Sequence, residues 1–150
     1  MCNKISVLLS VAVLGALCGC TIIREYPAGP ETRAAVSEQE FALARSLVEA
    51  FVANDGKKFI SLLPEESRKN FNKEAFDKTR KSIVESVGEP IAFSYLTKLE
   101  LTTLSPQIWR IRFRRVNAKS GEEFTSELLF RVVTGLVGKK QAVITGFQFI

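Results

Sequence analysis

The chain of 150 residues contains no histidine, and its three cysteines all lie within the first 20 residues. The missing imidazole excludes Ser-His-Asp and Cys-His catalysis and any other site that needs a histidine. What is present is an ordinary globular composition, with 46% hydrophobic and 25% charged residues. The chemistry available to the chain therefore depends first on what becomes of Cys2, Cys18 and Cys20.

Residues 1–19 have the pattern of a secretory signal, with one positive charge at Lys4 followed by an apolar stretch. The stretch is shorter than the roughly 20 apolar residues of a spanning helix, and no basic cluster follows it. The run Leu17-Cys18-Gly19-Cys20 resembles the lipobox of bacterial lipoproteins, although Cys18 departs from the small residue usual at its position. The resemblance implies cleavage before Cys20 and lipid attachment to its thiol. A single N-terminal transmembrane helix and signal cleavage without lipidation remain the alternatives.

This resemblance divides the chain into a signal peptide at 1–19, a lipidated cysteine and flexible tether at 20–36, and one domain at 37–150. The lipid would hold the protein on a membrane of the bacterial cell envelope, facing the periplasm or the exterior. Thr21 favours the outer membrane in a Gram-negative cell, by similarity to known sorting rules. The mature domain would then lack a disulfide, a catalytic cysteine and a Cys/His zinc site.

The first part of the domain is expected to be helical. Ser37 and Glu40 form a capping-box pattern, and apolar residues then follow helical spacing up to Val52. Short helical turns are expected on either side of Pro64, and Asn72 caps a longer helix that ends at Gly88.

The second part has the period of strands. Four strands are predicted at about 91–104, 107–117, 122–133 and 140–149, with short turns between them. Such turns have no room for crossover helices, so the strands form an antiparallel meander. Helices followed by strands indicate an α+β domain, with the N-terminal helices packed on one face of a curved four-stranded antiparallel sheet.

This order of elements resembles the nuclear transport factor 2-like, or cystatin-like, superfamily, and more narrowly a family of small bacterial domains of unknown function. The resemblance covers about residues 37–150 and includes the helix from Phe41 to Phe51, the helix ending at Gly88, the strand with Trp109 and the closing run 146–149. It implies a curved sheet over helices, often with a cone-shaped pocket. Some members are enzymes and many are binding or dimerisation modules, but no catalytic residue of the family can be placed on this chain.

The second predicted strand carries a stripe of arginines. Arg110, Arg112 and Arg114 alternate with apolar residues, so the three guanidinium groups share one face of the sheet. One interpretation is a surface that contacts an anion or a partner, extended by Lys98 and Arg131. The simpler interpretation is a solvated face on which Glu100 and Glu127 are the cross-strand partners.

The aromatic residues allow a similar choice. A ligand pocket could be lined by Phe93, Tyr95, Trp109, Phe113, Phe130 and Phe147. The simpler interpretation is that these side chains pack between the sheet and the helices.

The function expected from these features is non-enzymatic binding of a protein partner or small ligand by a lipid-anchored envelope domain. No catalytic residue, metal or cofactor is assigned, and no nucleic-acid partner is expected because the domain would lie outside the cytoplasm. The alternatives are a small pocket enzyme that uses carboxylate and tyrosine chemistry inside the cone, and a structural module that forms a homodimer through its sheet.

Overall fold

The computed structural model describes residues 30–99, 101, 103–138 and 141–150, with side chains described from Ser37 onward. The predicted signal at 1–19 and the predicted lipid site Cys20 lie outside the described residues. Four helices precede four strands: α1 (Pro30–Val52), α2 (Gly56–Ser61), α3 (Glu65–Asn70), α4 (Lys73–Val87), β1 (Glu89–Lys98), β2 (Leu104–Val116), β3 (Glu123–Val137) and β4 (Gln141–Phe149).

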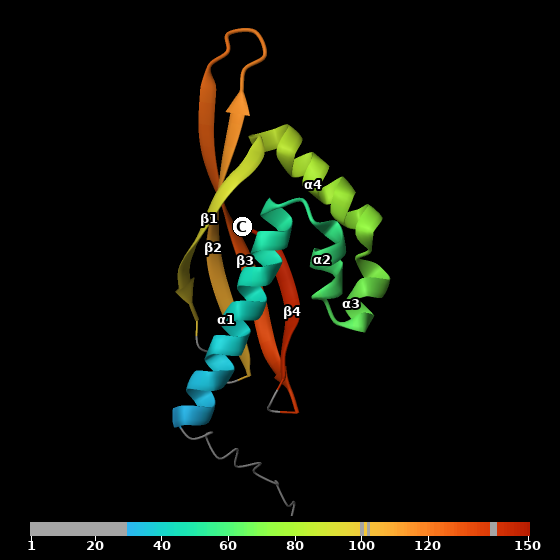
Figure 1. The fold of residues 1–150 in the computed structure, drawn as a ribbon, viewed down its shortest axis with the longest axis vertical. Coiled ribbons are helices and arrows are strands. Elements are labelled where there is room, and N and C mark those ends of the chain that lie inside the picture. The colour runs from blue at the N-terminus through green and yellow to red at the C-terminus, as the bar shows by residue number, and fades with distance from the viewer. Residues whose placement is uncertain (1–29, 100, 102, 139–140) are drawn as a thin grey trace, which may run out of the picture.

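The strands form one antiparallel sheet in the order β1-β2-β3-β4, so the predicted meander is confirmed. The helices lie on one face of this sheet, and α1 runs obliquely across it (Figure 1). The predicted α+β class, with N-terminal helices packed on a four-stranded antiparallel sheet, is therefore confirmed.

Helix α1 begins at Pro30 rather than at Ser37. The predicted N-cap at Ser37 was wrong, and residues 30–36, which were predicted to belong to the tether, continue the helix. Proline is well suited to a first helical turn, because its fixed φ is helical and the N–H that it lacks has no partner there. The Ser37 and Glu40 side chains are therefore not needed for capping and are available for other contacts.

The other helix boundaries follow local chemistry. The carboxylate of Asp55 accepts a hydrogen bond from the Lys58 N–H at 2.9 Å at the start of α2, and the Asn72 side chain accepts one from Ala75 at the start of α4. Gly88 ends α4 with φ +100°, and its N–H donates to the Val84 carbonyl at 2.9 Å. The predicted cap at Asn72 and stop at Gly88 are confirmed.

The first turn of the sheet lies earlier in the chain than predicted. Ser105 and Pro106 were expected in the turn, but both lie in β2. The Pro106 carbonyl accepts from the Leu99 N–H at 2.8 Å, so the ring nitrogen of Pro106 also points toward β1. The β1–β2 ladder ends at the pair Lys98–Gln107, and a residue without an N–H is tolerated beyond that point.

The core lies between the helices and the inner face of the sheet. Trp109, Ile111 and Phe113 of β2 are all buried there, as their alternation with arginines predicted. Burial of a large apolar side chain contributes roughly 1.5–3 kcal/mol, so this aromatic interior is the main source of stability for a domain that has no cysteine beyond Cys20.

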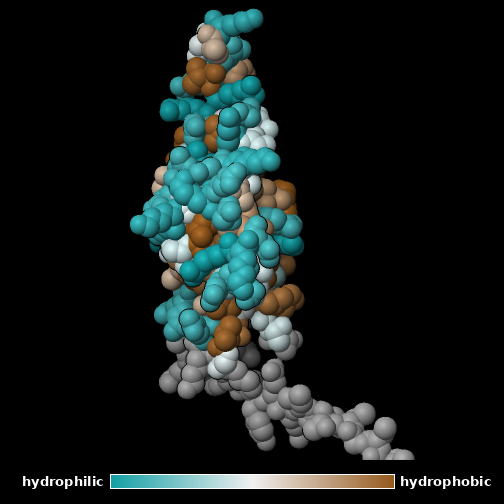
Figure 2. All heavy atoms as spheres, turned by 90° about the vertical axis from the view of Figure 1, so that its right-hand side faces the viewer, coloured by the Kyte–Doolittle hydropathy of each residue, from teal (hydrophilic) through white to brown (hydrophobic). Residues whose placement is uncertain are grey.

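The meander gives the molecule two different ends. The β1–β2 and β3–β4 turns lie at the end where α1 begins, and the β2–β3 hairpin projects past the helices at the other end (Figure 1). Hydrophilic residues cover most of the side seen in Figure 2, while hydrophobic atoms are exposed near the projecting hairpin. No helix in the described part of the chain is long and apolar enough to cross a membrane.

Candidate functional site

A small cavity lies between the helices and the β3–β4 half of the sheet, and its volume is about 150 Å³. Phenyl rings from α1, α2, α4, β3, β4 and the start of the α3–α4 connection make up most of its wall. The lining residues are Phe51, Phe59, Phe71, Phe76, Thr79, Phe130, Phe147, Gln148 and Phe149. The rings contact one another at centroid distances of 4.6 Å for Phe130–Phe149 and 5.1 Å for Phe59–Phe147. We refer to this space as the phenyl cavity.

The lining of the phenyl cavity determines what it can hold. Its polar side chains are Thr79 and Gln148, which are both exposed and therefore lie at its mouth, and no lining residue is ionisable. Apolar cavities of about 150 Å³ stay dry and bind a molecule of the size of benzene, whereas sites for larger ligands are typically about 300–1,000 Å³. The phenyl cavity therefore suits a single ring or a short aliphatic group.

The six aromatic residues that were expected to line a pocket do not lie together. Phe130 and Phe147 line the phenyl cavity. Phe113 is fully buried in the core and does not line this cavity. The remaining three residues lie on the β1 side of the sheet.

This second group of aromatic rings is centred on Trp109. Its ring lies 5.3 Å from Phe41 of α1, 5.3 Å from Tyr95 and 6.0 Å from Phe93, all measured between centroids. Trp109 is buried, whereas Phe41 and Tyr95 lie at the surface and stack edge to face. The group packs α1 onto the edge strand β1. Phe41 and Phe71 were not among the predicted pocket residues. They contact Tyr95, Trp109 and Phe147, which are distant from them in sequence.

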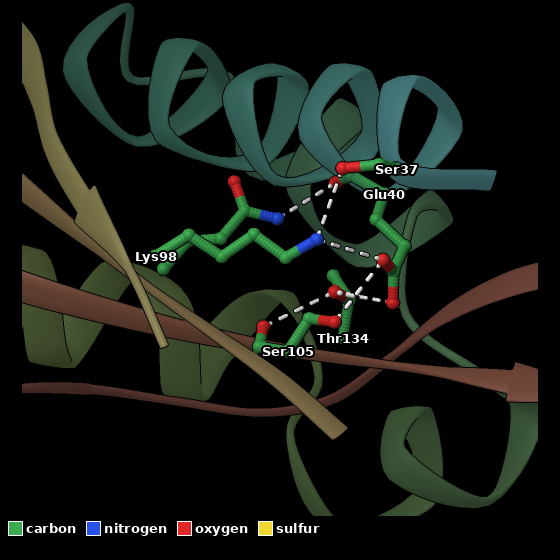
Figure 3. A network of polar contacts seen from close by, with 6 residues as sticks. Ser37, Glu40, Lys98, Ser105 and Thr134 are labelled. Atoms are coloured by element: carbon green, nitrogen blue, oxygen red, sulfur yellow. Dashed lines mark hydrogen bonds and ion pairs between the residues drawn. The ribbon is translucent and has the colours of Figure 1, made fainter. Parts of the chain in front are cut away.

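A buried carboxylate lies between α1 and the sheet (Figure 3). Glu40 is 5% exposed and accepts hydrogen bonds from Lys98 Nζ at 3.4 Å, Ser105 Oγ at 3.1 Å and Thr134 Oγ1 at 3.3 Å. Lys98 Nζ also donates to Ser37 Oγ at 3.0 Å. These contacts join one turn of α1 to three consecutive strands, β1, β2 and β3. We call this set the Glu40 network.

Gln107 adds a contact from the sheet to the helix backbone. Its Nε2 donates to the Glu40 carbonyl at 3.1 Å, while its buried Oε1 has no hydrogen-bond partner among the described residues. Part of the stabilisation from this contact is therefore lost to an unsatisfied acceptor. Because its three donors come from β1, β2 and β3, the Glu40 carboxylate ties α1 to the sheet.

The arginine stripe lies on the outer face of the sheet, which the described helices leave uncovered. Glu127 of β3 is opposite Arg112 and lies 3.4 Å from its Nε and 3.7 Å from Arg110 Nη1. Arg114 Nη1 lies 3.9 Å from Glu123. All three arginines are partly exposed, and exposed ion pairs contribute about 0–1 kcal/mol each.

The residues expected to join this stripe are divided between the faces. Lys98 lies on the inner face and belongs to the Glu40 network. Arg131 follows the outer-face alternation of β3, between the buried residues Phe130 and Val132. Glu100, the second expected partner, lies outside the described residues. The stripe is thus a charged ladder with more cations than acids.

Within the described ranges, no three Asp, Glu, Cys or His side chains come together as a metal site would require. The arrangement contains an apolar cavity, a positioning carboxylate and a charged sheet face. Of these three, the phenyl cavity is a hollow with apolar walls, and it has room for a small apolar ligand.

No protein-family model matches the chain, and no curated protein sequence is significantly similar to it. Among solved structures, the fold is similar to a ketosteroid isomerase-like protein from Erwinia carotovora atroseptica, with a TM-score of 0.53 and 11% identity over 75% of this chain and 92% of that one. A SEC-C motif-containing protein from Rhodopseudomonas palustris aligns with a TM-score of 0.44 and 18% identity, over 71% of this chain and 75% of that one. The first similarity supports the nuclear transport factor 2-like fold.

Proposed function

We propose that this chain is a lipid-anchored binding domain of the bacterial cell envelope, which takes a small apolar group into the phenyl cavity. The observation that carries the proposal is the cavity itself, a space of about 150 Å³ walled by seven phenyl rings with two polar residues at its mouth. Such a wall stabilises an apolar guest by excluding water from both surfaces.

The lining favours binding over catalysis. General acid–base chemistry needs an ionisable side chain within hydrogen-bond reach of the reacting group. Glu40 is engaged in its own network, and Tyr95 packs against Trp109 in the other aromatic group; neither residue lines the phenyl cavity. The alternative of a carboxylate–tyrosine pocket enzyme therefore has less support from the geometry.

The proposed anchor is the acyl group on Cys20. In this proposal, residues 1–19 are removed and the acylated cysteine holds the domain at the membrane surface. Its support is the lipobox pattern of Leu17-Cys18-Gly19-Cys20 and the length of the apolar stretch before it.

Ligand binding can be tested with benzene and toluene as probes and the thermal midpoint as the readout. We expect both probes to raise the midpoint of the wild type, because a ligand that binds the folded state alone stabilises it. Thr79→Met should place a longer side chain across the mouth and remove this shift. Lys78→Met is the matched control, since residue 78 is exposed on the same helix and does not line the cavity. If neither probe shifts the wild-type midpoint, or if both variants keep the shift, the cavity is not the binding site.

A further inference from the structure

Five large apolar side chains are exposed in or next to the two turns at the end of the sheet where α1 begins. They are Leu99 (54% exposed), Leu101 (59%), Leu104 (37%), Leu136 (40%) and Val137 (59%). Apolar side chains that project together from a surface are typical of contact sites for proteins or membranes. We call these five residues the turn-end patch.

Backbone pairing brings the two turns side by side. Leu104 is opposite Gly135, the residue before Leu136, in the β2–β3 ladder. On the other side, the Leu101 N–H donates to the Leu104 carbonyl at 3.2 Å. The patch therefore gathers residues of the β1–β2 turn, the start of β2 and the end of β3 at one end of the sheet, with Leu136 and Val137 on opposite faces of β3.

The start of the described chain lies at this same end. Ser37 Oγ, in the first half of α1, is 3.0 Å from Lys98 Nζ, and Lys98 is the last residue of β1 before the first turn. The segment 20–29 separates Cys20 from Pro30, which is ten residues by the printed numbering. Ten residues span at most about 33–36 Å when fully extended, so an anchor at Cys20 would leave the patch within reach of the membrane.

We propose that the turn-end patch docks on the lipid bilayer, with its leucine and valine side chains inserted at the interface. This inference rests on the proposed acyl anchor at Cys20. A bilayer suits the patch better than a protein groove does, because its members lie at the end of the sheet and neighbouring ones point to both faces, whereas a groove takes side chains from one face. The anchor would also make docking an intramolecular event, which raises the effective concentration of the membrane.

A fluorescent probe at residue 101 tests the docking directly. The full chain carrying Leu101→Cys is produced in cells, purified from membranes in detergent and labelled with an environment-sensitive maleimide. It is then reconstituted into vesicles of phosphatidylethanolamine and phosphatidylglycerol. Val137→Cys repeats the measurement on the second turn. Val116→Cys is the matched control, because Val116 is 52% exposed but lies at the opposite end of the sheet.

We expect blue-shifted emission from the probes at 101 and 137, and quenching by nitroxide lipids several-fold stronger than for the probe at 116. Equal quenching by aqueous iodide at all three positions would overturn the proposal. So would protection of residues 101 and 137 in intact cells combined with full exposure in protein-free vesicles, since a protein would then cover the patch.

The same experiment tests the proposed acylation of Cys20 separately, by thiol labelling of the wild-type protein. Wild-type protein that has lost residues 1–19 and carries an acylated Cys20 has no thiol to label, because Cys2 and Cys18 leave with the signal. Labelling of the wild type would therefore count against the anchor. An unlabelled wild type together with iodide-exposed probes would count against docking alone.

Discussion

Glu40 shows how a side chain's role can depend on where its helix starts. In the sequence, Ser37 and Glu40 match a capping box, but that pattern has the meaning of a cap only if Ser37 precedes the helix. Because α1 starts at Pro30, Ser37 and Glu40 lie inside the helix and reach Lys98, Ser105 and Thr134 instead. These partners are 58 to 94 residues away in sequence, and local patterns carry no information about such contacts.

Replacement of Glu40 should destabilise the fold far more than replacement of a surface glutamate on the same helix. Glu40→Gln removes the charge that compensates Lys98, and we expect a loss of about 1–3 kcal/mol in the free energy of unfolding. Glu40→Ala removes the charged partner of Lys98 and the acceptor of Ser105 Oγ, and should cost about 3–5 kcal/mol. Urea denaturation followed by circular dichroism measures both.

Glu49→Gln is the control for this prediction. Glu49 pairs with Arg45 at 2.9 Å and with Lys58 at 3.8 Å, but it lies on the solvent side of α1 and is partly exposed. Its loss should cost less than about 1 kcal/mol. Equal losses for Glu40→Gln and Glu49→Gln would mean that the buried network does not position α1.

At the level of elements, the helix-to-strand passage from α4 to β1 depends on one glycine. Gly88 has φ +100°, and a Cβ atom there would lie 2.3 Å from the carbonyl oxygen of Arg114 in β2. The missing side chain thus allows the end of α4 and the start of β1 to approach the sheet closely.

Gly88→Ala should therefore cost roughly 2–4 kcal/mol of stability, since backbone strain and a clash with main-chain atoms act together. Gly121→Ala is the matched control, because Gly121 also has a positive φ, +72°, but no atom lies within 4 Å of the position of its Cβ. We expect about 1 kcal/mol for that change. Thermal or urea unfolding of both variants decides the matter, and similar costs would show that the clash is relieved elsewhere.

The charged ladder on the outer face is predicted to contribute little to stability. A double-mutant cycle with Arg112→Ala and Glu127→Ala should give a coupling energy below about 1 kcal/mol, because both side chains are about half exposed. Screening should reduce that value in about 1 M salt. A larger coupling that persists in high salt would contradict the interpretation of a solvated face.

The sheet was the most predictable part of this fold, and the boundaries of its turns were the least. Alternation of buried and charged residues over 109–114 identified β2 and the face that it turns toward the helices. Pro106 was misplaced because a proline is excluded only where its N–H would have to donate to a neighbouring strand, and the sequence does not show that the β1–β2 register ends at Lys98 and Gln107. The phenyl cavity could not be predicted, since the eleven phenylalanines have no local feature that separates cavity walls from filled core.

At the scale of the whole molecule, the anchor proposal makes a simple prediction about location. Cys20→Ser should abolish incorporation of a palmitate analogue, because the acyl chains would have no thiol to join. It should also lower the share of the protein found in the membrane fraction. Labelling of cells followed by fractionation measures this. Cys18→Ser is the control, since residue 18 would leave with the signal and its replacement should alter neither readout. Unchanged labelling of the Cys20→Ser protein would remove the lipoprotein proposal.

The length of the projecting β2–β3 hairpin determines how far the domain would extend from the membrane. β3 has 15 residues and is roughly 50 Å long at about 3.3–3.4 Å per residue. If the turn-end patch rests on a bilayer and β3 stands upright, the tip of the hairpin is held at about that height above the lipid. Its exposed Val116 and Phe124 would then be the first surface met by anything attached to an opposing layer. Removal of two residues from each strand of the hairpin would lower this tip by about 7 Å while leaving the cavity and the anchor unchanged.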